Sequence, residues 1–242
     1  IQHRAGIARH DAVNWAFARA AAAAGVHIIQ QCEVSGFRTD DSRISAVETN
    51  RGLIGAGSVV LCVAGHSSQL AAKAGLRLPI ESIALQAMVT EPLKPTLHTV
   101  LGSLVIHAYI SQSDRDEIVI GGGADPFTSY AQRGILPTAK DNAAAVTELI
   151  PSFSRLRLMR QWAGICDISP DSSPIVGTTP VENLFLSSGW GTGGFKAIPA
   201  GGDTLAATIV NGQAHQLLRP FSLSRFENGK LLDEGAAAGV AH

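Results

Sequence analysis

The sequence predicts an α/β fold with α+β elements, in which a layer of helices and buried strands is interleaved with a mainly antiparallel layer. The alanine-rich segment 11–25 favours a helix. The continuous apolar run 59–63 is typical of a strand buried on both faces, and Gly65 leads from it into a second helix. From Pro79 onward the pattern changes to long alternating strands, which indicates antiparallel pairing.

Each remaining element is predicted from its own local pattern. Turn residues are expected at 40–42, 50–52 and 113–115, where polar residues and glycine separate apolar runs. In chain order, the predicted elements are a helix at 11–25, strands within 26–40 and 44–63, a helix after Gly65, strands at 80–92, 103–112 and 116–123, a helix at 138–149, a strand at 183–189, a helix at 199–211 and a polar tail.

The chain divides by pattern into three parts of one interleaved structure. Residues 1–78 are expected to form the remaining part of the layer of helices and buried strands. Residues 79–160 are expected to form the antiparallel layer, and 161–242 a C-terminal segment with its tail. The chain begins at Ile1 without an initiator methionine and enters a glycine turn and a helix at once. We therefore expect it to lack the N-terminal part of a longer protein.

Composition narrows the possible functions. The formal net charge of -1 gives no electrostatic reason to expect nucleic acid or an anionic membrane as a partner. No apolar run is long enough to span a bilayer, and no secretory signal opens the sequence. Cys32, Cys62 and Cys166 are scattered and odd in number, so we expect buried, reduced thiols in a cytoplasmic protein and no metal site.

The segment SSGWGTGGFKAIPAGG, residues 187–202, is rich in glycine, and Gly189, Gly191 and Gly194 satisfy G-x-G-x-x-G. A strand before it and a helix after it suit a nucleotide-binding turn. A Rossmann unit, however, needs a second strand with an acid for the ribose about 20 residues later, and here the helix leads into a polar tail. Lys196 opposes the dipole of the helix that it precedes, which indicates an anion or an electron-rich ring nearby. A tight turn without a ligand is the alternative.

The sequence WAGICDISPDSSPIVGTTPVENLFLSSGWGTGGFKAIPAGG resembles the C-terminal flavin-binding segment of the glycine/D-amino-acid oxidase family of FAD-dependent amine oxidoreductases. GIARHDAVNWAFARAA, IIQQCEV, HAYISQSDRDEIVIGG, SYAQRGILP and RFENGKLLDE are similar to the branch formed by the β subunits of heterotetrameric sarcosine oxidases. These motifs occur in the same order over almost the whole chain. The resemblance implies an FAD-binding Rossmann-like layer whose N-terminal βαβ unit is missing, with an interleaved antiparallel substrate layer.

The resemblance also implies where FAD is contacted. Lys196 matches a lysine beside the flavin, where its charge would stabilise the reduced ring and assist electron transfer to oxygen. Gly191 and Gly194 match positions whose backbone approaches the isoalloxazine, although turn geometry alone would also require glycine. Val34 matches a position whose backbone binds the adenine. A lysine exposed at a helix start is the plainer interpretation of Lys196.

His10, in the motif RHDAV, matches the histidine that carries a second flavin, FMN, by a covalent bond in heterotetrameric sarcosine oxidases. A neutral imidazole is a suitable nucleophile near neutral pH. A histidine beside a helix start with no such role is the alternative, as is attachment at His3. On the predicted strand 103–112, His107 and Tyr109 would share one face, which by resemblance covers the substrate cavity.

The implied reaction is oxidation of sarcosine to glycine, with formaldehyde or a folate-bound one-carbon unit as the second product and hydrogen peroxide from oxygen. Electrons would pass from FAD to FMN. The implied partners are a larger α subunit, which handles tetrahydrofolate, and small subunits of a heterotetramer. Two alternatives are a dehydrogenase of another secondary amine, such as dimethylglycine or proline, and a truncated, non-catalytic module that binds the larger subunit.

Overall fold

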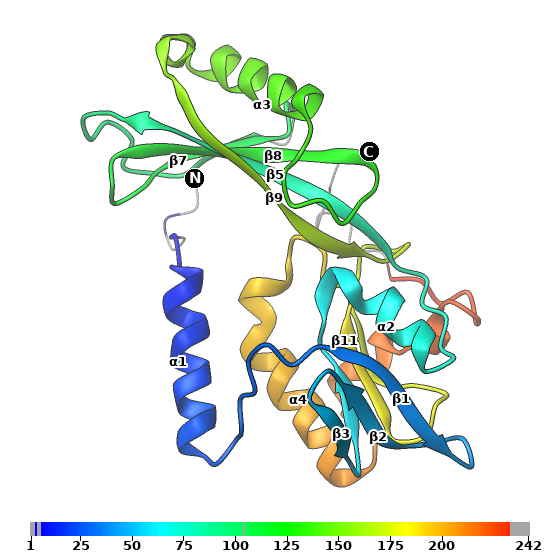
Figure 1. Cartoon of the computed structure of the whole chain (residues 1–242). Helices are drawn as coiled ribbons and strands as arrows, with labels where there is room; N and C mark the ends of the chain where they lie inside the picture. Colours follow the sequence, from blue (N-terminus) through cyan, green and yellow to red (C-terminus); the bar gives the residue numbers. More distant parts are fainter. Residues whose placement is uncertain (1–2, 4–5, 104, 233–242) are drawn as a thin grey trace.

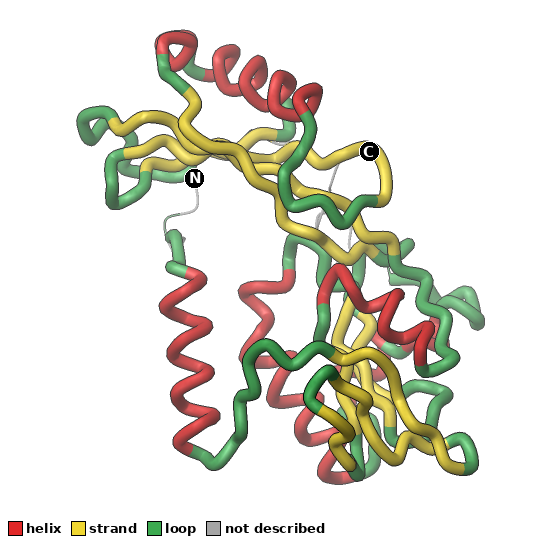
Figure 2. Tube along the Cα trace, viewed as in Figure 1, coloured by secondary structure: helices red, strands yellow, loops and turns green. Residues whose placement is uncertain are grey.

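The computed structural model describes residues 3, 6–103 and 105–232. Figure 1 shows two tiers: a five-stranded sheet covered by α3 lies above a group that contains α1, α2, α4 and two smaller sheets. Figure 2 shows that the upper tier is mostly strand, whereas most of the described helix lies in the lower tier. The outer end of the polar tail, residues 233–242, lies outside the described residues.

The elements follow a mixed order along the chain. Their bounds are α1 (His10–Ala23), β1 (Val34–Asp40), β2 (Arg43–Thr49), β3 (Gly52–Gly55), β4 (Val59–Leu61), η1 (Ala64–His66), α2 (Ser67–Lys73), β5 (Glu81–Pro92), β6 (Leu101–Ser103), β7 (Ala108–Gln112), β8 (Glu117–Thr128), α3 (Leu136–Leu149), η2 (Pro151–Arg155), β9 (Leu158–Ile168), β10 (Ile175–Thr178), β11 (Leu184–Ser188), η3 (Gly194–Ala197), α4 (Ile198–Asn211), η4 (Gln216–Phe221) and η5 (Leu223–Arg225), where η marks a short 3-10 helix.

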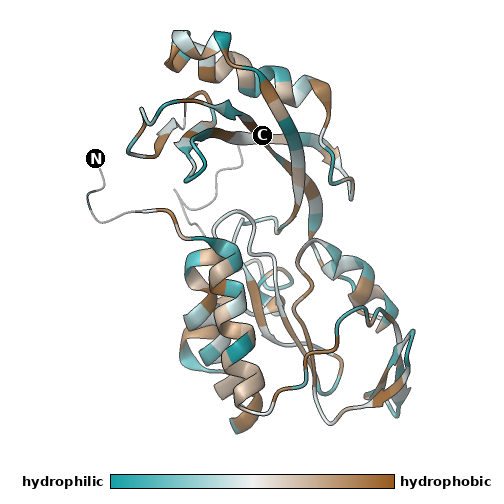
Figure 3. Ribbon diagram, turned by 60° about the vertical axis from the view of Figure 1, so that its left-hand side comes forward, coloured by the Kyte–Doolittle hydropathy of each residue, from teal (hydrophilic) through white to brown (hydrophobic). Residues whose placement is uncertain are grey.

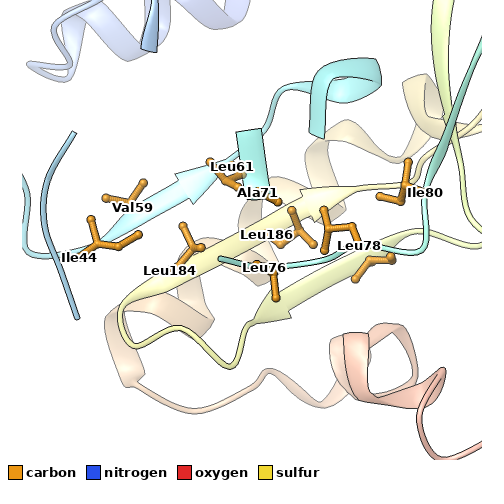
Figure 4. Packing of buried hydrophobic residues seen from close by; sticks show 10 residues of the cluster. Ile44, Val59, Leu61, Ala71, Leu76, Leu78, Ile80, Leu184 and Leu186 are labelled. Carbon is orange, nitrogen blue, oxygen red and sulfur yellow. The ribbon is translucent and has the colours of Figure 1, made fainter. Parts of the chain in front are cut away.

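The lower tier holds two three-stranded sheets. β1, β2 and β3 form an antiparallel meander, and Asp41 and Ser42 in its first turn have positive φ angles of 46° and 70°, as a two-residue hairpin requires. The second sheet has the order β10-β11-β4, with β11 parallel to β4 and antiparallel to β10. Aliphatic side chains from both sheets and α2 form the core of this tier (Figure 4): Ile44, Val59, Leu61, Ala71, Leu76, Leu78, Ile80, Ile175, Leu184 and Leu186.

The upper tier is one antiparallel sheet with the strand order β6-β7-β8-β5-β9. α3 covers one of its faces, where Met88, Ile110, Ile118 and Ile120 pack with Val146 of the helix. Because successive side chains of a strand point to opposite faces, the residues between these positions face the lower tier. β9 continues this sheet as far as Ile168, and neither β9 nor β10 was expected as a strand from the sequence.

Part of the predicted strand at 26–40 is absent. Pairing begins only at Val34, and Val26, Ile28 and Ile29 are each more than half exposed. In the part of the chain that the structure describes, no strand pairs with residues 26–33. These residues therefore have no neighbouring strand with which to form backbone hydrogen bonds, and the prediction of a strand was wrong for 26–33.

The predicted strand at 103–112 is a hairpin. β6 ends at Ser103, and His107 has a φ angle of 48°, so the chain turns before β7 begins at Ala108. A left-handed residue interrupts the period of two along a strand. The expectation that His107 and Tyr109 share a strand face was therefore wrong, because His107 lies in the turn.

α1 is a long helix that packs only loosely against the rest of the described chain. None of its residues is buried, and Figure 3 shows both hydrophilic and hydrophobic positions on its surface. Arg9, just before it, forms ion pairs of 3.7 Å with Asp11 and with Asp114 in the turn between β7 and β8. α1 therefore starts beneath the five-stranded sheet (Figure 1). None of the described helices is long and apolar enough to cross a membrane.

Candidate functional site

The candidate site lies where two parallel strands end side by side. β4 and β11 are paired in register, with Leu61 opposite Leu186. Because the strands are parallel, the segments that follow them, 62–67 and 189–196, leave the sheet at the same edge. In open α/β sheets, ligands bind outside the carboxyl ends of parallel strands. These two segments are therefore two sides of one candidate site.

The segment after β4 is a tight turn held by buried hydroxyl groups. Ala64 has a φ angle of 44°, which is uncommon for a residue other than glycine. Gly65 has no room for a side chain, since a Cβ there would lie 2.2 Å from Ile165 Cγ2. Ser67 Oγ donates to Ala64 O and Ser82 Oγ donates to Gly65 O, both at 2.5 Å. The backbone is thus fixed in an unusual shape at a strand end.

Sequence reasoning did not assign a site role to this turn. The available signal was the apolar run 59–63, which ends at Gly65 directly before a helix. All three cysteines are free; Cys32 and Cys166 are half-buried, but Cys62, beside this turn, is exposed, so the expected burial was wrong for Cys62. Among the described residues, no group of three or more His, Cys, Asp or Glu side chains is placed to hold a metal ion.

The glycine turn after β11 binds an acid of the protein itself. Gly189 and Gly191 have φ angles of 73° and 54°. Gly189 N donates to Asp167 Oδ2 at 2.5 Å, and Gly191 N donates to Asp167 O at 3.0 Å. Burial raises the pKa of Asp167, although the backbone N–H groups of residues 189–191 act in the opposite direction. Amides that face Asp167 cannot cradle a phosphate, so this G-x-G-x-x-G is not a pyrophosphate site.

Gly194 is required by packing. A Cβ at this position would lie 2.7 Å from Trp190 Cβ, closer than real Cβ contacts. Trp190 is held in turn by a hydrogen bond of 3.0 Å from its Nε1 to Ser187 Oγ. The turn-geometry explanation therefore accounts for Gly194, and contact of the Gly191 and Gly194 backbone with a flavin ring stays a prediction.

Lys196 lies in η3, immediately before α4, and is exposed. It has no ion pair within the described part of the chain, and the first turn of α4 contains no acidic residue. A cavity of about 430 Å³ separates this segment from α1. Its lining residues are Gly6, Ala8, Val13, Phe17, Phe195, Lys196, Ile198 and Pro199. The cavity is apolar apart from one cation at its edge.

The structure brings only some of the predicted site residues together. His10 is the exposed first residue of α1, and Val13 and Phe17, farther along that helix, line the cavity that Lys196 also lines. Val34 starts β1, where it pairs with Thr49, and is not part of this cavity.

The sheet face that looks toward the lower tier carries two aromatic residues, Tyr109 and Trp162, at the ends of a row of four paired residues. Tyr109, Gly121, Ala87 and Trp162 lie opposite one another on four neighbouring strands. The Tyr109 ring fills the space beside Gly121, where a Cβ would lie 2.5 Å from the Tyr109 hydroxyl. Burial raises the pKa of Tyr109, and the Arg160 guanidinium lies 5.6 Å from the centre of the Trp162 ring. Sequence reasoning missed Trp162 and Arg160, because β9 was not recognised as a strand.

The family comparison decides how this geometry is interpreted. A model described as "DAO: FAD dependent oxidoreductase" matches residues 1–208. The chain belongs to this family. Membership in the FAD-dependent oxidoreductases confirms the predicted α/β fold class and the resemblance stated from the motifs.

Individual relatives agree with this assignment. The chain is 49% identical over 242 residues to a sarcosine oxidase subunit beta of Rhodobacter capsulatus, and 52% identical over 241 residues to one of an Arthrobacter species. It covers 58% and 60% of these relatives, so it spans less than two thirds of their length. Among solved structures, the L-proline dehydrogenase of P. horikoshii has a TM-score of 0.83 at 29% identity, over 91% of this chain and 60% of that one. Glycine oxidase of Geobacillus kaustophilus has a TM-score of 0.76 at 26% identity, over 87% and 56%.

The residues of the site suit one part of FAD and not another. Lys196 and the amino end of α4 present positive charge without a neighbouring acid, which suits the electron-rich side of a flavin ring. The amides of Gly189 and Gly191 face Asp167 and do not suit the pyrophosphate. In an FAD-dependent oxidoreductase, this C-terminal segment therefore fits the ring end of the cofactor.

Proposed function

We propose that this chain is part of the FAD-binding β subunit of an enzyme that oxidises sarcosine. The observation that carries the proposal is 49% and 52% identity, over essentially the whole chain, to two sarcosine oxidase β subunits. Lys196 supports it, since this lysine makes no ion pair in the described part of the chain and borders an apolar cavity, and a flavin ring is planar, largely apolar and electron-rich.

The proposed reaction converts sarcosine to glycine. FAD, when bound, takes up two electrons and a proton from the N-methyl group of the amine. Water then releases formaldehyde from the resulting imine, or the one-carbon unit passes to tetrahydrofolate; oxygen takes the electrons and leaves as hydrogen peroxide. The role of the chain is to position cofactor and substrate and to supply charge.

Each predicted residue has a part in this scheme. Lys196 stabilises negative charge on the ring, at the border of a cavity whose other lining residues are apolar. The backbone of Gly191 and Gly194 approaches the ring, and the backbone of Val34 binds the adenine. Tyr109, on the sheet face toward the lower tier, covers the substrate.

We further propose that His10 carries FMN and that an α subunit covers it. His10 is exposed at the start of α1, and this helix shares the cavity lined by Lys196, so electrons from FAD would have a short path to it. The larger α subunit would handle tetrahydrofolate, and small subunits would complete a heterotetramer.

The function is tested on the protein co-expressed with its partner subunits. We expect bound FAD and oxygen-dependent turnover of sarcosine, measured as peroxide formation. A purified protein that is colourless, or that holds FAD without oxidising any secondary amine, would contradict the proposal. Such a result would favour a non-catalytic subunit.

The FMN assignment is tested by mass spectrometry of proteolytic peptides. A peptide containing His10 should carry the mass of FMN, and His10→Ala should remove it. If the added mass is found on His3, or on no histidine while FAD is present, the assignment to His10 is wrong.

A dehydrogenase of proline is the second candidate, because the L-proline dehydrogenase of P. horikoshii matches the fold with a TM-score of 0.83 at 29% identity. Proline turnover with an artificial electron acceptor, without turnover by oxygen, would favour it. Dimethylglycine should be tested as a substrate in the same assay.

A further inference from the structure

Four buried polar side chains join the candidate site to the five-stranded sheet. We call them the junction cluster: Ser67, Ser82, Asp167 and Ser188, all at most 3% exposed. Ser67 Oγ and Ser188 Oγ lie 2.7 Å apart and link the start of α2 directly to the end of β11. The cluster therefore lies where the two turns of the site meet β5 and β9.

Asp167 is the member that binds the glycine turn. It accepts hydrogen bonds at two points, with Oδ2 from Gly189 N and with its main-chain oxygen from Gly191 N. Asp167 is also in register with Ser82 of β5, whose hydroxyl donates to Gly65 O in the other turn. The paired residues Ser82 and Asp167 thus contact both turns of the cofactor site.

The charge environment of Asp167 is unusual. Within the described chain it has no cationic partner, in contrast to Asp171, whose carboxylate binds Arg225 at 2.7 Å. Its donors are main-chain amides of the glycine turn, and burial raises its pKa. A buried carboxylate without a cation costs free energy, so its presence here needs a compensating role. The mechanism proposed above does not use this group.

We propose that Asp167 is a positioning residue, which holds the glycine turn at a fixed distance from the isoalloxazine ring and so aligns the five-stranded sheet with the cofactor. This role rests on the proposed binding of FAD at this site. The turn cannot move toward or away from the sheet without losing the hydrogen bonds of Gly189 and Gly191. The distance between a substrate bound under the sheet and a flavin ring bound at the turn would therefore stay constant.

The main test compares two substitutions of Asp167 in the co-expressed enzyme. Asp167→Ala removes the acceptor of the Gly189 amide, and we expect the Kd for FAD, from quenching of flavin fluorescence, to rise about tenfold or more. Asp167→Asn keeps an oxygen for the same amide, and we expect its Kd to stay within about threefold of wild type. In the apoprotein, hydrogen exchange at Gly189 should be faster in Asp167→Ala than in Asp167→Asn, because only the Gly189 amide is bound by the side chain of Asp167.

Asp125→Ala is the matched control. Asp125 is also 3% exposed and accepts hydrogen bonds from Gln86 and Thr138, but it lies on β8 at the face toward α3. We expect this variant to lower the melting temperature while leaving the Kd for FAD and the exchange at Gly189 unchanged.

The outcomes separate the two proposals. Normal FAD affinity and slow exchange in Asp167→Ala, or equal weakening of FAD binding in Asp125→Ala, would overturn the positioning role alone. A wild-type enzyme that holds no FAD would overturn the proposed function and this role together.

Discussion

Trp190 determines where the glycine segment can carry side chains. Its ring occupies the space beside two glycines: a Cβ at Gly194 would lie 2.7 Å from Trp190 Cβ, and one at Gly201 would lie 3.0 Å from Trp190 Cη2. Gly193, between the tryptophan and Gly194, has no atom within 4 Å of its Cβ position. Adjacent glycines of one motif therefore have different physical reasons to be glycine.

Gly194→Ala should lower the free energy of unfolding by about 1–3 kcal/mol, because the new methyl group overlaps Trp190. Gly193→Ala is the control: its φ of -92° is accessible to alanine and its Cβ position is open, so we expect little change. Urea unfolding of both variants measures the difference. Equal stability of the two would show that the turn can shift to accept a side chain.

Lys196→Met should impair amine oxidation and spare cofactor binding. If the lysine charge stabilises the ring after it accepts electrons, the rate should fall by about tenfold or more, roughly 1.4 kcal/mol. Much of the FAD should remain bound, which its absorbance will report. Lys140→Met, which removes an exposed lysine of α3, should leave the rate unchanged. Wild-type turnover in Lys196→Met would remove the proposed role of this lysine.

At the scale of elements, the C-terminal segment is attached to the loop between β9 and β10 by one buried ion pair. Arg225 of η5 binds both carboxylate oxygens of Asp171, at 2.7 and 2.8 Å, and both side chains are 2% exposed. Arg225 also donates to Ser173 O, and Leu232 N donates to Asp171 Oδ2. Breaking such a pair on one side leaves an uncompensated buried charge, which typically costs about 3–5 kcal/mol.

This ion pair predicts acid sensitivity. Burial opposes the ionisation of Asp171, but the hydrogen bonds and charge of Arg225 and the Leu232 amide outweigh it and hold its pKa well below the ordinary 3.8. A carboxyl whose folded pKa is lowered stabilises the fold above its unfolded pKa and loses that contribution as pH falls toward the folded pKa. The free energy of unfolding should therefore decrease as pH is lowered from about 5.

Urea unfolding across this pH range is the measurement. The double variant Asp171→Asn/Arg225→Met lacks both charges and should show a shallower decrease below pH about 4. Identical slopes for wild type and the double variant would mean that other carboxyl groups cause the acid sensitivity.

Elements with local signals could be predicted from the sequence. The helices expected at 11–25, 138–149 and 199–211 are confirmed as α1, α3 and α4, because alanine content and end residues act within the helix itself. Gly212, with a φ angle of 66°, is the residue at which α4 ends. The run 26–33 and the β6–β7 hairpin could not be predicted, because a strand depends on a partner elsewhere in the chain and one left-handed residue reverses its direction.

At the scale of the whole molecule, apolar side chains are exposed on α1 and on the run that follows it. Trp15 and Phe17 of the helix are 59% and 48% exposed, and Val26, Ile28 and Ile29 are similarly exposed. Contiguous exposed apolar residues favour association and dye binding. This surface lies in a chain that covers 58–60% of the length of its sarcosine oxidase relatives.

The 242-residue chain on its own should bind a hydrophobic dye such as ANS. Ile28→Ser with Ile29→Ser should lower the dye fluorescence clearly, since both residues lie in this run. Val210→Ser is the control, because Val210 is more exposed, at 83%, but lies on α4, outside this run. A larger loss of fluorescence in the control would contradict the assignment of the dye site.

The site was predictable only where residues adjoin in sequence. Lys196 and the glycine turn follow one strand, so their pattern is visible in a single segment. The turn at 64–67, the hydrogen bonds of Asp167 and the position of Trp162 depend on β4, β5, β9 and β11 coming together, and no local sequence pattern predicts that arrangement. For the same reason, the glycine pattern alone could not reveal that its amides were already bonded within the protein.

The pairing of β4 with β11 also has a consequence for the order of folding. These strands are neighbours in space but lie about half the chain apart in sequence, so their contact requires closure of a very long loop. During synthesis on the ribosome, the edge of β4 that pairs with β11 stays unpaired until β11 has left the exit tunnel. The end of the sheet that would receive the flavin can therefore form only after β11 has been synthesised, and cofactor loading should not precede that step.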